Sequence, residues 1–291
     1  NELCSDNVDN DNNGHSDCDD FSCCRYGQPA SGITVCTSGT CGGGARDGGT
    51  SSGRDAGTKP VLTEVEATIV QIRTQTSDYS DVTSFPAVPK KIVTIKDVIV
   101  VGSYKHSAGD VDLYIQEAAG GAHSGINVNY TPAAGGTPAA VGKKVTVKGC
   151  VKTSYGVMLI QWCGDADNTQ ATVTETGTGT VPTPDAFPAS ELGAEATTHD
   201  DHIGQPIRVQ DELTVDSATA DECKGSNGSF FCLKLKDASN HTVYLKTDFV
   251  HKCSAAQLAG PFTDLVGAWD FYQTSSKALL RQVAPLSCDA L

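Results

Sequence analysis

The sequence predicts a mainly β protein, in which two tandem five-stranded barrels follow a disulfide-rich N-terminal segment. Three observations support this prediction. Short β-branched stretches, several with alternating apolar and polar positions, recur along most of the 291-residue chain. These stretches follow a similar order in two halves of the chain, as expected for a diverged internal repeat. Half of the twelve cysteines precede residue 42, where apolar residues are sparse.

Composition divides the chain into five consecutive parts. A Cys-rich acidic segment covers residues 1–41, and a Gly/Ser-rich linker covers 42–58. A first β-domain is expected at 59–170 and a second at 191–291, joined by a Thr/Pro-rich connector at 171–190. The N-terminal part has too few apolar residues to fold unaided, so crosslinks or a metal ion must stabilise it.

Each β-domain is predicted to hold about five strands, bounded by Gly, Pro and Asn. In the first domain they are expected at 90–101, 111–117, 125–130, 143–151 and 156–162. In the second they are expected at 204–215, 230–238, 241–247, 264–273 and 277–286. Three pairs of similar stretches, one member from each domain, mark the repeat: VTIKD with IRVQD, LYIQE with LKLKD, and INVNY with TVYLK. The stretch 63–72 is compatible with either a helix or a strand.

The cysteines favour disulfides over zinc sites. Their number is even, and the chain has none of the C-x-x-C pairs that zinc sites usually show. Disulfides imply an oxidising compartment. We expect a Cys150–Cys163 bond to close a hairpin and a Cys223–Cys232 bond to bracket KGSNGSFF. The remaining Cys253 and Cys288 would hold the C-terminus.

A net charge of −14 argues against a nucleic-acid partner, because binding to phosphates relies on basic side chains. The charge favours an extracellular or cell-surface protein, cation binding, or both. No apolar run reaches the ~20 residues that span a bilayer, so membrane attachment would need an anchor outside this chain. Without an initiator methionine or an apolar leader at Asn1, the chain is expected to be a mature or trimmed product.

The stretch DNDNNGHSDCDD, residues 9–20, has the spacing of a calcium loop. Its glycine permits the sharp turn, and His15 would contribute its backbone carbonyl. An aspartate replaces the usual final Glu, and cysteines replace the flanking helices, which favours an EF-like loop resembling thrombospondin-type calcium repeats. A solvated acidic terminus is the alternative. The expected calcium ligands are Asp9, Asp11, Asn13, His15, Asp17 and Asp20.

The strand order that ends in VGKKVTVKGCV and YGVMLIQ resembles OB-like domains of secreted bacterial proteins. Some of these domains are appended to extracellular nucleases, and others occur in surface proteins of the myxobacterial kind. The stretch DDHIGQPIRVQDELTV resembles the opening of the partner domain in such tandems. ELCSDNVDNDNNGHSDCDDFSC is similar to the acidic, Cys-flanked segment that often precedes them. The resemblance implies OB-like barrels and a secreted or surface location.

Two short motifs are weaker candidates for a functional site. GTSSG at 49–53 fits G-x-S-x-G, but a nucleophile elbow requires a strand before it and a helix after it, and this copy lies in the linker. HDDH at 199–202 carries metal-capable side chains, but its polar position before a strand favours a solvated turn. We therefore expect no catalytic site.

Other side chains bear on binding. Aromatic residues on the expected strands could stack nucleic-acid bases, as in OB folds. Their alternating positions instead favour a place in the core. These residues are Tyr114, Phe230, Phe231 and Tyr244. A local basic strip consists of Lys143, Lys144, Lys148 and Lys152. Glycosylation sequons, which indicate exposed positions, begin at Asn129, Asn227 and Asn240.

Together these patterns favour a non-enzymatic extracellular structural protein. It would be a calcium- and disulfide-stabilised subunit of a surface fibre, layer or matrix that self-associates into a homo-oligomer or polymer. One alternative is an OB-fold binding module for glycan or single-stranded nucleic acid. Another is an accessory part of a secreted hydrolase.

Overall fold

The computed structural model divides the chain into two compact units, residues 1–57 and 58–291. The structure describes residues 24–25, 28–29, 34–36, 62–81, 88–105, 109–133, 136–154, 157–164, 169–194, 196–224, 231–247, 253–273, 279–286 and 288. In the first unit, β1 (Cys24–Arg25) pairs with β2 (Gln28–Pro29). The predicted calcium loop, the linker and GTSSG lie outside the described residues.

Five strands of the second unit form a closed barrel: β6 (Lys91–Lys105), β7 (Val111–Gln116), β8 (Gly125–Tyr130), β9 (Lys143–Ser154) and β10 (Val157–Gln161). Around the barrel the order is β6-β7-β8-β10-β9, and β9 pairs back to β6. Only β8 and β10 run parallel within this closed set of described strands. This is the strand order of an OB-like barrel, as predicted.

β6 closes the barrel because it pairs with two neighbours along different parts of its length. Its register shifts between Ile95 and Val98 where it faces β9, and between Val100 and Gly102 where it faces β7. Such bulges bend a strand and increase its twist. Asp97, within the first bulge, has a φ of 55°.

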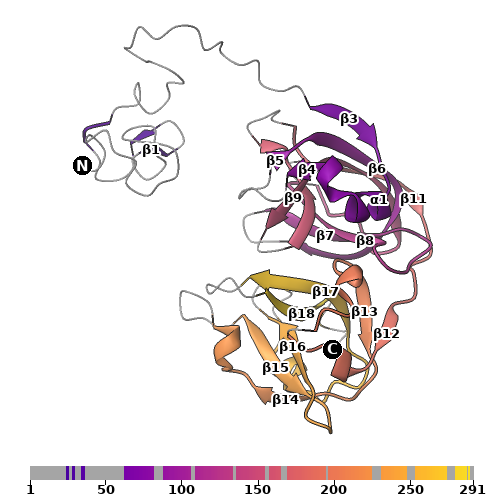
Figure 1. Cartoon of the computed structure of the whole chain (residues 1–291), viewed down its shortest axis with the longest axis vertical. Helices are drawn as coiled ribbons and strands as arrows, with labels where there is room; N and C mark the ends of the chain where they lie inside the picture. Colours follow the sequence, from indigo (N-terminus) through magenta and orange to yellow (C-terminus); the bar gives the residue numbers. More distant parts are fainter. Residues whose placement is uncertain are drawn as a thin grey trace, which may run out of the picture. The chain divides into compact units, whose positions relative to one another are not determined.

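The ambiguous stretch 63–72 contains a strand followed by the start of a helix. β3 (Thr63–Glu66) pairs parallel with β6, and α1 (Ile69–Thr74) follows. The helix begins where it does because Thr68 and Gln71 form a capping box. Ile69 and Ile72 of α1 are fully buried in the barrel core, and Figure 1 shows α1 against the barrel strands.

The remaining short strands form a small separate sheet and the edges of the two large sheets. β4 (Ser80–Asp81) pairs with β5 (Val88–Pro89). β11 (Thr172–Thr178) pairs with β9, and β12 (Asp185–Phe187) pairs with β13 of the second sheet. Both strands fall within residues 171–190, where the sequence suggests a connector. This segment therefore adds an edge strand to each sheet.

The second sheet repeats the strand order of the first. Its strands are β13 (Pro206–Val209), β14 (Thr214–Ser217), β15 (Cys232–Lys236), β16 (Thr242–Lys246), β17 (Val266–Gln273) and β18 (Leu279–Pro285). β16 and β18 are parallel, as β8 and β10 are. β13 and β14 share the role of β6, since β13 pairs with β17 and β14 with β15. The repeat inferred from the sequence is thus visible as topology.

The strand expected at 204–215 is divided between β13 and the start of β14 because the residues between them bond elsewhere. Asp211 Oδ2 accepts a hydrogen bond of 2.6 Å from the backbone N–H of Ala189. Leu213 forms an isolated bridge with Phe262. The described 3₁₀ turns are η3 (Thr76–Asp78), η5 (Ala189–Glu191), η6 (Asp200–His202), η7 (Asp221–Cys223) and η8 (Gln257–Ala259).

Within the described residues, three disulfides have both partners in view and join Cys150 to Cys163, Cys223 to Cys232 and Cys253 to Cys288. The pairings expected from the sequence are confirmed. No cysteine is free among the residues that the structure describes. The bonds indicate an oxidising compartment. Within the same described part of the chain, no helix is both long and apolar enough to cross a membrane.

The two barrels pack directly against each other. Val98 and Val100 of β6 point into the first barrel core, whereas the alternate residues Ile99 and Val101 face outward. Outside the barrel they join Tyr114 in an apolar cluster with Ala268, Ala284 and Leu286 of the second domain. The continuous apolar run VIVV therefore belongs to a strand that is buried on both faces.

Glycines allow the two domains to approach closely. A Cβ on Gly102 would lie 2.5 Å from Leu286 Cδ2. A Cβ on Gly125, the first residue of β8, would lie 2.4 Å from the Cβ and 2.8 Å from the Cα of Gln205. The second contact involves backbone, so a side-chain rotation alone cannot relieve it.

Replacing Gly125 with Ala should therefore destabilise the junction by about 1–3 kcal/mol, the usual cost of overpacking. Gly177→Ala is the matched control, because no heavy atom lies within 4 Å of its Cβ position. Guanidinium denaturation of the two variants measures the difference. Equal stabilities would contradict the tight contact at Gly125.

Removing the Cys150–Cys163 bond by a double change to Ala should lower the free energy of unfolding. The bond closes a sequence separation of 13 residues, for which the chain-entropy model gives about 3 kcal/mol. Chemical denaturation under non-reducing conditions measures the loss. A variant as stable as the parent would show that this crosslink does not constrain the unfolded chain.

Candidate functional site

The described residues bring two histidines and several carboxylates together at the turn 199–202, before β13. The turn is closed by backbone bonds from His202 N to His199 O (3.0 Å) and from Ile203 N to Asp200 O (3.4 Å). It ends at Gly204, whose φ of 86° suits a glycine. The N–H of Gly204 then donates to Trp269 O at 2.8 Å, which joins the turn to β17.

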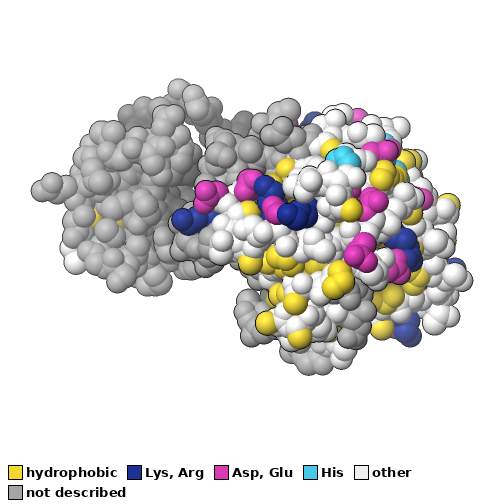
Figure 2. All heavy atoms as spheres, turned by 90° about the horizontal axis from the view of Figure 1, so that it is seen from below, with side chains coloured by type: hydrophobic (Ala, Val, Ile, Leu, Met, Phe, Trp, Pro, Cys, Tyr) yellow, Lys and Arg dark blue, Asp and Glu magenta, His cyan; other side chains and the backbone are white. Residues whose placement is uncertain are grey.

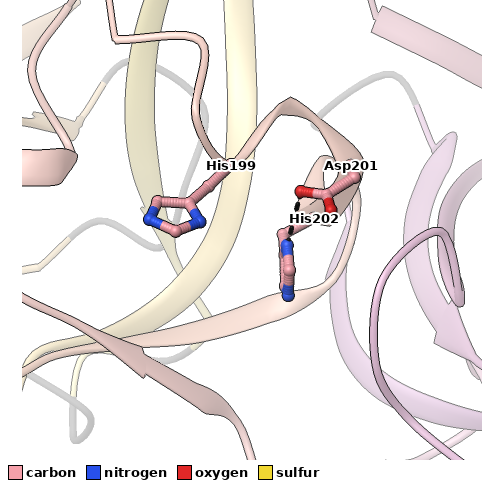
Figure 3. A group of neighbouring side chains, drawn as sticks. All are labelled: His199, Asp201 and His202. Carbon is pink, nitrogen blue, oxygen red and sulfur yellow. Dashed lines mark hydrogen bonds and ion pairs between the residues drawn. The ribbon is translucent and has the colours of Figure 1, made fainter.

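Both imidazoles contact carboxylates. His199 Nε2 lies 2.6 Å from Glu191 Oε2. His202 Nδ1 lies 2.7 Å from Asp201 Oδ1, and its Nε2 lies 3.1 Å from Asp185 Oδ2. Figure 3 shows both rings projecting from the same turn, with the Asp201 carboxylate beside His202. Potential ligand atoms of His199, Asp201 and His202 all lie within 4.8 Å of one another.

Phe187 of β12 holds the two rings in place. Its ring stacks on His199, with centroids 3.7 Å apart, and meets His202 edge-on at 4.9 Å. The side chains of His199 and His202 are each only 12% exposed. The histidines are therefore packed residues rather than freely moving surface groups.

The environment keeps Asp201 ionised. Burial by itself would raise the pKa of this carboxyl, but the hydrogen bond with His202 and the electrostatic effects of His202 and His123 outweigh it. The net result is a pKa below the usual value. Asp201 therefore presents a charged oxygen beside two ring nitrogens.

A guanidinium from the second barrel anchors the turn. Arg281 of β18 donates from Nε and Nη2 to the two carboxylate oxygens of Asp200, each at 2.6 Å. Its Nη1 also donates to Ala194 O at 3.2 Å. The Arg281 side chain is 7% exposed and the Asp200 side chain 37% exposed, so the guanidinium is buried while its carboxylate partner still reaches solvent.

A second guanidinium reaches the turn from the first barrel. Arg73 of α1 donates from Nη2 to Asp200 O at 3.0 Å and from Nη1 to Ile203 O and, at 3.2 Å, to Gly125 O. Burial lowers the pKa of Arg73 to about 10, against the opposing effects of Asp201 and Asp200. The guanidinium remains charged at neutral pH and links α1, β8 and the turn.

The backbone of the first barrel also contacts the turn. His123, in the loop between β7 and β8, donates its N–H to Asp201 O at 2.6 Å. Next to it, Ser124 Oγ bonds to Gln205 Oε1 at 3.1 Å and accepts from Gln116 Nε2 at 3.0 Å. The histidine–carboxylate cluster is thus built into the contact between the barrels.

The interpretation of HDDH as a solvated turn is wrong for the two histidines, which are packed, whereas the side chains of Asp200 and Asp201 are still 37% and 38% exposed. The partners of these histidines, Asp185, Phe187 and Glu191, lie outside the motif, on β12 and η5. The only local sequence feature that pointed to this cluster was the pair of histidines three positions apart with two aspartates between them. Whether such a turn is solvated or packed depends on which segments fold over it.

Two of the four lysines of the expected basic strip pair with carboxylates, and a third packs on an aromatic ring. Lys143 lies 3.3 Å from Glu175, and Lys148 lies 2.6 Å from Glu64. Lys152 sits over the ring of Trp162, with Nζ 4.7 Å from the centroid. On the face shown in Figure 2, basic side chains lie beside acidic ones. The strip therefore resembles an ion-paired surface more than a track for phosphates.

The aromatic residues on the strands belong to the packed interior. Tyr114, Phe231 and Tyr244 are 7%, 4% and 3% exposed, and Phe230 lies outside the described residues. Burial is the main reason that the pKa values of Tyr114 and Tyr244 are raised, to about 12 for Tyr244. These side chains offer no open stacking surface.

The sequons differ in accessibility. Asn240 is exposed, in the turn between β15 and β16. Asn129 is half-buried in β8 and donates to Asp112 Oδ1 at 2.8 Å, so the expectation that it is exposed is wrong. Asn227 and the calcium ligands expected at 9–20 lie outside the described residues.

Comparisons with known proteins identify no family. No protein-family model and no curated protein matches the chain. A solved structure titled "Molecular basis for abrogation of activation of pro-inflammatory cytokines" is 13% identical, with a TM-score of 0.31, and the match covers 67% of this chain and 88% of that chain. A likeness at this level carries no argument about this protein.

Replacing Arg281 with Leu should cost about 1.5–3 kcal/mol of stability, the range for hydrogen bonds to charged groups, because the half-exposed Asp200 carboxylate would lose its bidentate donor. Arg208→Leu is the matched control. Arg208 pairs with Asp264 through side chains that are 37% and 64% exposed, so its loss should cost about 1 kcal/mol or less. Thermal and denaturant unfolding measure both. Similar losses for the two variants would contradict a special role of Arg281.

Proposed function

We propose that the chain is a non-enzymatic extracellular structural protein, a calcium- and disulfide-stabilised subunit of a surface fibre, layer or matrix. The observation that carries this proposal is the way in which the two barrels are joined. An apolar cluster, two arginines and two tightly packed glycines connect them within one compact unit. A subunit of a regular assembly needs such a constant spacing between its domains.

The disulfides support the same proposal. One bond staples the first barrel and two staple the second domain. Crosslinks of this kind maintain a fold outside the cell, where neither chaperones nor reductants protect it. An extracellular or cell-surface location follows from the proposal and fits the oxidising compartment that the bonds indicate.

The contact between the barrels also weighs against the binding-module alternative. OB folds commonly bind oligonucleotides and oligosaccharides on the face of their second and third strands. In the first barrel, Tyr114 of the second strand instead packs toward Ala268 and Ala284 of the other domain. No described residue specifically favours an accessory role in a hydrolase.

Calcium has an electrostatic role in the proposed assembly. Subunits with a net charge of −14 repel one another at close range. A calcium ion bound by Asp9, Asp11 and neighbouring ligands would neutralise part of the N-terminal charge. We propose that residues 1–41 form contacts between subunits once calcium is bound, while the barrels supply the folded body.

The full-length oxidised protein tests this proposal by light scattering and electron microscopy, with calcium and with a chelator. We expect oligomers or polymers in millimolar calcium and dissociation when the chelator is added. Calorimetry should detect a calcium site with a dissociation constant of about 10⁻⁴–10⁻³ M or tighter, the range of extracellular modules. The double variant Asp9→Ala/Asp11→Ala should lose both properties.

A matched control removes the same charge elsewhere. Glu212 and Asp221 are exposed residues of the second domain, so Glu212→Ala/Asp221→Ala should assemble as the parent does. The proposal fails if the parent remains monomeric in calcium, or if the Asp9/Asp11 variant assembles equally well. Saturable binding of single-stranded DNA or a glycan by a monomeric parent would favour the binding-module alternative.

A further inference from the structure

We infer that His199, His202 and Asp201 bind a divalent transition-metal ion, Zn²⁺, at the junction between the two barrels. This site is separate from the calcium loop expected at residues 9–20. It does not depend on the proposed structural function. The inference rests on the hydrogen-bond partners of the two imidazoles, on the charge around them and on their position in the fold.

The partners of His202 are inconsistent with a neutral ring alone. Both of its nitrogens face carboxylate oxygens, those of Asp201 and Asp185. Ionised carboxylates only accept hydrogen bonds, and a neutral imidazole has a single N–H to donate. One contact therefore requires either a second ring proton or a cation between nitrogen and oxygen. A zinc ion that binds both Nδ1 and Asp201 would supply that cation once their 2.7 Å contact opens.

Each imidazole also has a carboxylate on its other nitrogen. Glu191 contacts Nε2 of His199, and Asp185 contacts Nε2 of His202. Metal-binding histidines almost always donate their second N–H to such a group, which fixes the tautomer and the ring orientation. The arrangement leaves Nδ1 of both rings for the metal, and Figure 3 shows the two rings on the same side of the turn.

The donor set favours zinc over calcium. Imidazole nitrogen suits Zn²⁺ and related metals, whereas Ca²⁺ takes six to eight oxygen ligands. The ligand atoms lie within 4.8 Å of one another. Zinc bonds of about 2.0–2.1 Å place tetrahedral ligand atoms roughly 3.3 Å apart. The 2.7 Å contact between His202 Nδ1 and Asp201 Oδ1 must therefore open, and side-chain rotations must accompany binding. With three protein ligands, the fourth position of the metal is left for water.

Zinc at this place would strengthen the link between the barrels. The bound turn is held by Arg73 of the first barrel and Arg281 of the second, and Asp201 O accepts from His123 N. The metal would connect the two ends of the turn through His199 and His202. We therefore expect zinc to raise the melting temperature of the protein.

The test uses the oxidised full-length protein, stripped of metal and titrated with ZnCl₂ by calorimetry in millimolar calcium, which occupies oxygen-ligand sites. We expect a zinc site with a dissociation constant in the micromolar range or tighter. His199→Ala should weaken it at least tenfold. His241→Ala is the matched control, because His241 Nδ1 also contacts a carboxylate, Asp237 Oδ2 at 2.8 Å, but has no second histidine in its turn.

Co²⁺ added to the unmodified protein gives a second measurement that does not depend on a variant folding. Visible d–d bands that zinc displaces and calcium does not would support the site. The inference is overturned if the parent shows no saturable zinc binding and no such bands. It is also overturned if His199→Ala and His241→Ala bind zinc as tightly as the parent does.

Discussion

Two guanidinium groups from different domains hold the same residue, Asp200, and the arrangement of residues 58–291 depends on this contact. Arg281 binds the carboxylate, while Arg73 binds the backbone carbonyl. Both arginines are largely buried, so each must find acceptors or leave a costly unpaired charge. Asp200 provides hydrogen-bond acceptors for both arginines. The turn 199–202 that contains it therefore forms the joint, that is, the polar contact between the two barrels.

The joint changes what the barrels can do. In an isolated OB-like barrel, the outer faces of β6 and β7 would be open to ligands, but here Ile99, Val101 and Tyr114 pack against the second domain. Gly102 and Gly125 permit this approach, since a Cβ on Gly125 would meet the backbone of Gln205 and a Cβ on Gly102 would meet the end of the Leu286 side chain. The tandem therefore gives up a surface that such folds often use for binding and gains a fixed spacing between domains, which supports the proposed structural role.

Much of the fold could be predicted because it depends on local patterns. Alternation in VTIKD and VTVKG identified β6 and β9, and nearby cysteines identified the Cys150–Cys163 and Cys223–Cys232 bonds. Bounds were less predictable where distant residues intervene. The bond from Ala189 N to Asp211 separates β13 from β14, and pairing with β9 turns part of the expected connector into β11.

The candidate site shows which features the sequence can predict and which depend on the tertiary structure. The sequence by itself determined the mainly β class, the two disulfide-stapled repeats and the acidic charge, because strand periodicity, cysteine spacing and composition are local or additive properties. Only the tertiary structure decided that the two histidines of HDDH are packed rather than solvated. Glu191, Phe187 and Asp185 reach the histidines from another turn and strand, and such convergence depends on how the chain folds back, which no local pattern encodes.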